Sequence, residues 1–213
     1  MNFPVDAVTL LTFIPAALAL NLTPGADMMF CLGQGLRGGW RAAMAADLGI
    51  VLGGLVQVTI AGLGLGALVA QYPWLFDAIR WVGVGYLLWL AWGALAGAIA
   101  GPGLASDGPQ VRPGRAFWQA LLVSLTNPKV ILFVLAFIPQ FVDPDRGPVL
   151  AQFLIFGAVL CAGGLVINGL VGVFAGGLGS RMVRSPRLAR ALGLASGAIF
   201  AGLAVRLAVM QRG

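Results

Sequence analysis

Long apolar runs alternate with short polar connections along this chain. Six runs are long enough to cross a bilayer as helices, because about 20 helical residues span the hydrocarbon core. The predicted spans are residues 6–33, 42–70, 75–99, 116–142, 149–177 and 188–210. This pattern predicts an all-α integral membrane protein with six transmembrane helices.

Proline interrupts two of these runs. The first contains Asn-Leu-Thr-Pro-Gly-Ala-Asp at Asn21–Asp27, and the fourth contains Thr-Asn-Pro-Lys at Thr126–Lys129. Because proline has no backbone N–H, we expect helices one and four to break at Pro24, followed by Gly25, and at Pro128. A broken backbone survives in a membrane only inside protein or beside a watery cavity, and secondary transporters place such breaks around their substrate.

The two halves of the chain resemble each other. Gly-Gly-Leu-Val at residues 53–56 recurs at 163–166, and Arg80 and Gly83 recur at the same separation as Arg190 and Gly193. Three spans per half give the halves opposite orientations, so a three-plus-three inverted repeat is predicted. A single transmembrane domain, residues 1–213, would comprise repeat A (1–100), a Gly- and Pro-rich cytoplasmic linker (101–115) and repeat B (116–213).

Composition supports a membrane protein, since 60% of residues are hydrophobic and 9% are charged. The net charge of +6 comes from arginines in the connections, which is typical of a topological signal rather than of nucleic-acid binding. No basic stretch precedes the first run, so we interpret it as a retained span. The first, third and fifth connections carry more arginines than the others, which predicts that both termini lie outside and that these connections lie in the cytoplasm. Their arginines are Arg37, Arg41, Arg112, Arg115, Arg181, Arg184, Arg187 and Arg190.

Asp27 and Lys129 are the candidate charged groups of the site, one at each break. A half-helix that begins after a break presents unpaired N–H groups suited to a carboxylate. A substrate with an ammonium and a carboxylate would then find a partner for each. The alternative is a structural ion pair, or for Asp27 a favourable interaction with its helix dipole.

Other polar residues near the breaks are substrate or coupling candidates with structural alternatives. Asn21, Thr23 and Asn127 are of the helix-capping type. Gln57 and Asn168 occupy nearly matching places in spans two and five, where interhelical hydrogen bonding is the alternative. We interpret Asp47, early in span two, as interfacial rather than on the permeation path.

At the breaks the sequence resembles the LysE/RhtB family of bacterial amino-acid exporters. The matching segments are Thr23–Asp27, Gly49 to Gly53, Gly83–Gly93, Asn127–Lys129 with Phe133, and Pro139–Phe141. The resemblance implies a multi-pass bacterial inner-membrane protein that exports amino acids or close derivatives, driven by proton antiport. It also implies substrate or coupling roles for Asp27, Asn127 and Lys129, and hinge roles for Pro24, Gly25 and Pro128. The family usually has a second proline where this chain has Ala26, so the geometry of the first break can differ.

Two competing functions remain open. A membrane thiol-redox carrier of related fold would need Cys31 and Cys161 to approach each other, although neither lies in a Cys-X-X-Cys motif. A heavy-metal or divalent-cation exporter would need soft or acidic ligands, and the chain has no histidine and no glutamate. We expect no catalytic residue, cofactor or resident metal, and the glycine-rich helix faces permit a homodimer.

Overall fold

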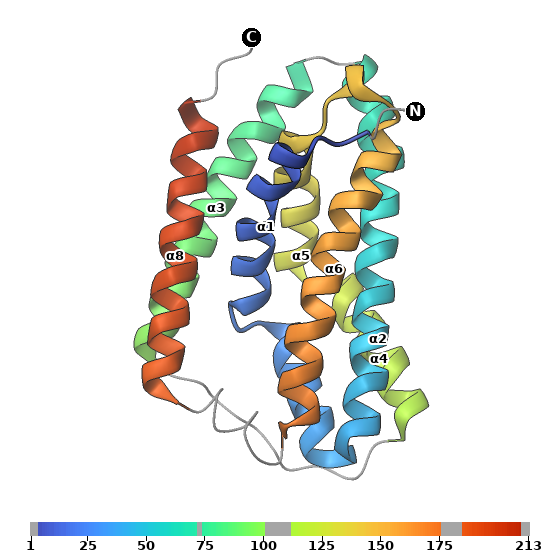
Figure 1. Cartoon of the computed structure of the whole chain (residues 1–213), viewed down its shortest axis with the longest axis vertical. Coiled ribbons are helices and arrows are strands. Elements are labelled where there is room, and N and C mark those ends of the chain that lie inside the picture. Colours follow the sequence, from blue (N-terminus) through green and yellow to red (C-terminus); the bar gives the residue numbers. More distant parts are fainter. Residues whose placement is uncertain (1–3, 72–73, 101–111, 176–184, 210–213) are drawn as a thin grey trace.

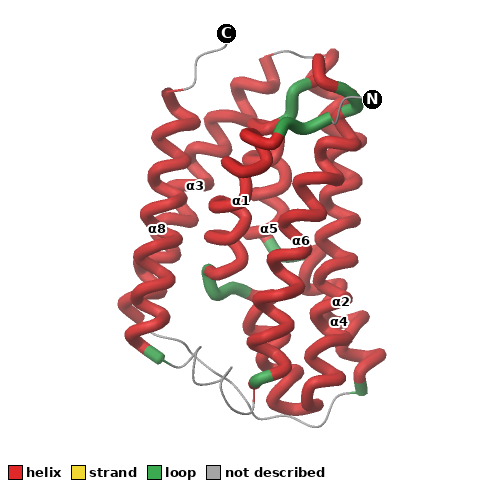
Figure 2. The backbone as a smooth tube through the Cα atoms, viewed as in Figure 1, coloured by secondary structure: helices red, strands yellow, loops and turns green. Residues whose placement is uncertain are grey.

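The computed structural model describes residues 4–71, 74–100, 112–175 and 185–209, and the regular structure within them is helical (Figures 1 and 2). Residues 101–111, most of the predicted linker, lie outside the described residues. Residues 113–115, also assigned to the linker, are helical instead. The α-helices are α1 (Ala7–Leu22), α2 (Ala26–Gln71), α3 (Trp74–Ala100), α4 (Pro113–Leu125), α5 (Pro128–Leu132), α6 (Val149–Val173) and α8 (Pro186–Val209).

Several of these helices have the length and apolarity of membrane spans. Within the described residues, Ala26–Gly64 of α2 and α6 satisfy both requirements, and the bent pair Pro113–Leu125 with Pro128–Phe141 can form a third span. Ala7–Leu22, Val84–Ala96 and Arg190–Val205 are shorter apolar helices. The chain is therefore an all-helical membrane-embedded protein.

The first predicted break is confirmed. Helix α1 ends at Leu22, Thr23 has an extended conformation (φ −71°, ψ 115°), and α2 begins at Ala26. The predicted connection after this span is wrong in detail, because α2 stays helical except at Gly39. Gly39 has φ 70°, a left-handed conformation that glycine adopts without a Cβ clash, and there the chain turns back (Figure 1).

The second break is also confirmed, and the segment after it is less regular than the sequence predicted. Helix α4 ends at Leu125, α5 begins at Pro128, and the two parts are bent by 47°. A π-helix, η1 (Phe133–Phe137), and a 3-10 helix, η2 (Ile138–Phe141), then replace α-helix. Pro139 supplies the physical reason, since it offers no N–H to the preceding turn.

The helices form two groups joined by α1. Helix α2 packs against α4 and α6, whereas α3 packs mainly against α8. Helix α1 lies between the groups and touches both α6 and α8 (Figure 1). The start of α1 and the end of α8 lie at the same end of the bundle (Figure 1).

Five phenylalanines fill the core between the first break and the end of the bundle where α1 starts. Phe13 of α1 is at their centre, with ring centroids 4.9 Å from Phe156 and 5.3 Å from Phe141. Phe133 and Phe137 of η1 lie 6.1 and 6.2 Å from the same ring. We call this set the phenylalanine cluster: Phe13, Phe133, Phe137, Phe141 and Phe156.

Glycine permits the close approach of α2 and α4. A Cβ on Gly49 would lie 2.2 Å from the backbone oxygen of Phe117, a contact that real Cβ atoms do not make. A Cβ on Gly64, farther along α2, would meet nothing within 4 Å. The two positions therefore form a matched pair on one helix.

We expect Gly49→Ala to destabilise the fold by about 1–3 kcal/mol, because the helices must separate to accommodate the methyl group. Gly64→Ala should leave stability unchanged or slightly higher, because alanine has the better helix propensity. Thermal unfolding of the detergent-solubilised proteins measures both. Equal unfolding temperatures for the two variants would contradict this packing.

Candidate functional site

Lys129 connects the two breaks. Its ammonium, carried on α5 directly after Pro128, donates hydrogen bonds to the backbone oxygens of Leu20 and Thr23, both at 2.7 Å. These carbonyls end α1 and have no N–H donor farther along their own helix. Gly25 leaves room for the ammonium, which lies 3.1 Å from where a Cβ on residue 25 would be. The second break thus supplies the cap for the first.

The Gln57 side chain caps the end of α4, as Lys129 caps the end of α1. Its side-chain Nε2 donates to the backbone oxygens of Ser124 at 2.9 Å and Leu125 at 3.3 Å. Ser124 stands four residues before Pro128, as Leu20 stands four residues before Pro24. The interhelical hydrogen bonding considered for Gln57 is therefore confirmed. Its acceptors are carbonyls at the end of α4, and that of Ser124 also accepts the Asn127 backbone N–H at 3.0 Å.

The repeated Gly-Gly-Leu-Val segments also contact the breaks reciprocally. A Cβ on Gly53 would lie 2.7 Å from the Cβ of Ser124, in the last turn of α4. A Cβ on Gly163 would lie 2.7 Å from Nδ2 of Asn21, in the last turn of α1. Each segment therefore packs against the helix end before the other half's break.

The three capping candidates have three different roles. Asn127 is the N-cap of α5, because its side chain accepts a hydrogen bond from the backbone N–H of Lys129 at 3.0 Å. The hydroxyl of Thr23 donates instead to Ala19 within α1, at 2.7 Å. Asn21 does not cap either, since its Nδ2 donates to the Leu160 oxygen of α6 at 3.0 Å. Among the three, side-chain N-capping is thus confirmed for Asn127, and Thr23 is the C-cap residue of α1.

Asp27 lies in the first turn of α2, beside the same break. Its Oδ1 is buried and has no hydrogen-bond partner among the described residues. The carboxyl is within electrostatic reach of Lys129 and the Asn127 amide, but the Lys129 hydrogen bonds above go to carbonyls. Pro24, Ala26 and Pro128 are exposed in the isolated protein. The breaks thus bring together an unpartnered acceptor and a cation, next to residues that are exposed in the isolated protein.

Asn168 of α6 lies close to the first break. The sequence did not predict that its side chain would lie near that of Asn21. It is 5% exposed, and its Nδ2 is 3.9 Å from the position of a Cβ on Gly164. Oδ1 of Asn21 is 3.4 Å from the same position. The two amides therefore share the notch that Gly164 leaves in α6.

The sequence placed Asp47 at the wrong position and did not point to Gln34. The interfacial interpretation of Asp47 is wrong, because its side chain is 0% exposed and lies inside the bundle against α6. Neither carboxyl oxygen has a hydrogen-bond partner among the residues described, and the same holds for both side-chain polar atoms of Gln34. The missed signal was the turn at Gly39, which folds the two parts of α2 together.

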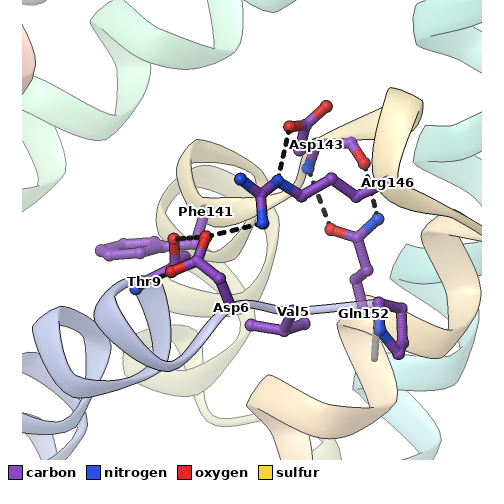
Figure 3. A pocket seen from close by; sticks show the side chains of 8 residues that line it. Val5, Asp6, Thr9, Phe141, Asp143, Arg146 and Gln152 are labelled. Atoms are coloured by element: carbon purple, nitrogen blue, oxygen red, sulfur yellow. Dashed lines mark hydrogen bonds and ion pairs between the residues drawn. The ribbon is translucent and has the colours of Figure 1, made fainter. Parts of the chain in front are cut away.

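A small pocket of about 190 Å³ lies far from the breaks, where α1 begins (Figure 3). Arg146 crosses it, pairing with Asp6 at 3.1 Å and Asp143 at 3.2 Å. Gln152 donates to the backbone oxygens of Asp143 and Gly147 and accepts from the Asp143 N–H. Its polar groups are engaged with one another, so this corner ties the start of α1 to the segment before α6.

Asp6 in this corner caps α1 as an anion. The Thr9 backbone N–H, then the Thr9 hydroxyl and more weakly Arg146, hold the pKa of its carboxyl below the usual value. A lowered pKa in the folded state means that the contribution to stability is present above the unfolded-state pKa. It is lost as pH falls through the folded-state value.

Comparison with known proteins agrees with this architecture. The sequence profile of the LysE type translocators matches residues 18–211. The chain belongs to the LysE type translocator family. It is therefore a membrane transporter and not an enzyme.

Individual relatives cover nearly all of the translocator. A homoserine/homoserine lactone efflux protein of Salmonella typhimurium is 34% identical over 88% of this chain and 90% of its own length. An uncharacterized membrane protein of Vibrio cholerae is 31% identical over 97% of this chain and all of its own. An uncharacterized membrane protein of Pseudomonas aeruginosa is 33% identical over 92% of this chain and 93% of its own length. No solved structure matches the chain.

We expect Lys129→Met to destabilise the translocator by about 1–3 kcal/mol, because the Leu20 and Thr23 carbonyls lose their donor inside the bundle. Arg146→Met removes a cation with a side chain that is 51% exposed, and should change stability by less than about 1 kcal/mol. Thermal unfolding in detergent compares the two. A larger loss for Arg146→Met would contradict the assigned role of Lys129.

Proposed function

We propose that this translocator is a secondary exporter of homoserine-like amino acids across the bacterial inner membrane, working by proton antiport and alternating access. One observation carries the proposal. The two helix breaks meet, joined by the hydrogen bonds from Lys129 to the end of α1. A discontinuous helix pair at the centre of a bundle is where secondary transporters bind their substrates.

The chemistry of the breaks fits a zwitterionic amino acid. Asp27 offers a buried, unpartnered carboxyl oxygen to an ammonium. The first N–H groups of α2 lack intrahelical partners and suit a carboxylate, and Ala26 there is exposed. Homoserine enters this proposal from the names of the Salmonella efflux proteins. Asn127 and Lys129 fix the breaks around this substrate.

A six-span, three-plus-three inverted repeat is the topology we propose, with repeat A at 1–100 and repeat B at 116–213. The reciprocal packing of Gly53 on the end of α4 and Gly163 on the end of α1 supports it. So does the return of α8 to the end of the bundle where α1 starts (Figure 1). Arginine placement puts that end outside and the linker in the cytoplasm.

The phenylalanine cluster supports alternating access. It fills the route from the first break toward the end of the bundle where α1 starts, and Phe13, Phe133 and Phe156 are 0% exposed. The π-helix and 3-10 helix that carry three of its rings are irregular backbone, which rearranges more readily than regular α-helix. In this conformation the outer route is closed, and export requires the cluster to open.

Membership of a translocator family leaves the two competing functions little support. Cys31 is buried and Cys161 lies with its sulfur 3.8 Å from the Val51 oxygen, and both are free thiols. The direct test of the proposal is efflux from vesicles that contain the purified protein. We expect L-homoserine to be exported faster when a proton gradient is present, and cadmium and zinc not to be exported. Metal export without amino-acid export would overturn the proposal.

Asp27→Asn should reduce L-homoserine efflux by at least about 100-fold, because the neutral amide cannot balance the substrate ammonium in a site of low dielectric. The protein should still insert and elute as a single species in size-exclusion chromatography. Asp145→Asn, a carboxyl-to-amide change at an exposed residue in the connection before α6, is the matched control and should keep normal efflux. Normal, pH-dependent efflux by Asp27→Asn would remove the assigned role.

Because the charges of Asp27 and Lys129 interact, we expect a second substitution at Asp27 to restore part of the stability that Lys129→Met loses. Lys129→Met removes the cation whose charge acts on Asp27, so adding Asp27→Asn should recover part of the lost stability. Thermal unfolding of both single variants and the double variant closes the cycle. A double variant whose loss equals the sum of the two single losses would show that Asp27 and Lys129 are independent.

A further inference from the structure

Asp47 is a buried carboxyl that the proposed function leaves unused. Its side chain is 0% exposed, and neither oxygen has a hydrogen-bond partner in the described part of the chain. A carboxylate without a partner inside a membrane bundle carries a large desolvation cost. That cost is relieved when the group binds a proton or a cation.

The described surroundings leave space for the carboxyl, and no positive charge among them acts on it. A Cβ on Gly169 of α6 would lie 2.9 Å from Oδ2, so a larger residue there would displace the carboxyl. Among the described groups, Asp27 is the one whose charge acts on Asp47, and it repels a second negative charge. The charged or titratable groups on α4, on α6 and on the first part of α2, which pack beside Asp47, are Asp27, Cys31, Arg37, Arg115 and Cys161.

A second observation is that the first part of α2, between the first break and Gly39, carries several buried polar side chains. Asp27, Cys31 and Gln34 follow one another at spacings of four and three residues, so they share one face of α2. The Cys31 thiol lies within electrostatic reach of both Asp27 and Asp47. Gln34 is 0% exposed, with both polar atoms of its side chain unpartnered among the described residues. These groups lie between the first break and the turn at Gly39.

We infer that Asp47 is a second proton-binding site, separate from the carboxyl that holds the substrate ammonium. This inference rests on the proposed function. In the outward-facing state Asp47 takes up a proton from the outside and becomes a neutral carboxylic acid, while Asp27, still ionised, gives up the substrate. After the substrate has left, Asp47 carries that proton back and releases it to the cytoplasm, at the end of the bundle where α2 turns at Gly39, and becomes a carboxylate. One proton thus enters for each substrate exported, and exchange of one substrate for another needs no proton.

The different surroundings of the two carboxyls assign them different tasks. Asp27 has Lys129 and the Asn127 amide within reach, so it can remain an anion for a cationic ligand. Among the described charged groups, Asp47 experiences only the repulsion from Asp27. Two carboxyls whose environments differ in this way divide proton carrying and charge binding between them.

The first arm of the test needs no substrate. Infrared difference spectra between neutral and alkaline pH report the carbonyl stretch of a buried protonated carboxylic acid. We expect wild type and Asp27→Asn to show this band, and Asp47→Asn to lack it. Persistence of the band in Asp47→Asn, or its absence from wild type, would overturn the inference even if L-homoserine were not the substrate.

The second arm separates proton coupling from substrate binding. In proteoliposomes, Asp47→Asn should lose gradient-driven L-homoserine transport by at least about tenfold while homoserine–homoserine exchange stays within about twofold of wild type. Asp27→Asn should lose both activities, and the exposed control Asp145→Asn should lose neither. Loss of exchange in Asp47→Asn, or retained driven transport, would contradict the inference. No transport by wild type would count against the proposed function alone.

Gly169→Ala provides a variant that keeps the carboxyl. Its methyl group would press on Oδ2 of Asp47 at 2.9 Å and change the environment of the proton. We expect the pH dependence of driven transport to shift while exchange persists. An unchanged pH profile in a folded Gly169→Ala protein would contradict a proton on Asp47. This variant also tests the inference if Asp47→Asn fails to fold.

Discussion

The structure depends on how two broken helices satisfy their terminal carbonyls without water. Each break leaves acceptors at the end of α1 and α4, and an unpaired acceptor in a membrane interior is costly. The chain meets this requirement from elsewhere in the bundle, through the Lys129 ammonium for α1 and the Gln57 amide for α4. The Lys129 hydrogen bonds hold the two breaks together, and they also place a cation within electrostatic reach of Asp27.

The same requirement explains which residues stand where the helices cross. Gly53 and Gly163 bring the neighbouring helices against the last turns before the breaks, and Gly25 leaves space for the Lys129 side chain. Tyr86 of α3 donates a hydrogen bond from its hydroxyl to the Lys129 backbone oxygen, so the third helix also holds this region. Close backbone approach and side-chain caps thus work together at the centre of the protein.

Much of this arrangement could be predicted from the sequence, because proline and apolar run length act locally. Pro24 and Pro128 marked both breaks, and the position of Gln57 suggested an interhelical amide. The acceptors of that amide could not be predicted, because they depend on a tertiary contact that residue spacing does not reveal. The burial of Asp47 likewise required knowing that α2 turns at Gly39 and packs its second part on α6. The π-helix η1 could not be predicted in detail, because Pro139 indicates irregular backbone without specifying its type.

The most direct measurement is an experimental structure of the translocator in lipid nanodiscs with L-homoserine bound. We expect α1 to end before Pro24, the Lys129 ammonium to lie on the Leu20 and Thr23 oxygens, and the ligand ammonium to lie at Asp27. Helices continuous through Pro24 and Pro128, or a ligand bound away from both breaks, would contradict it.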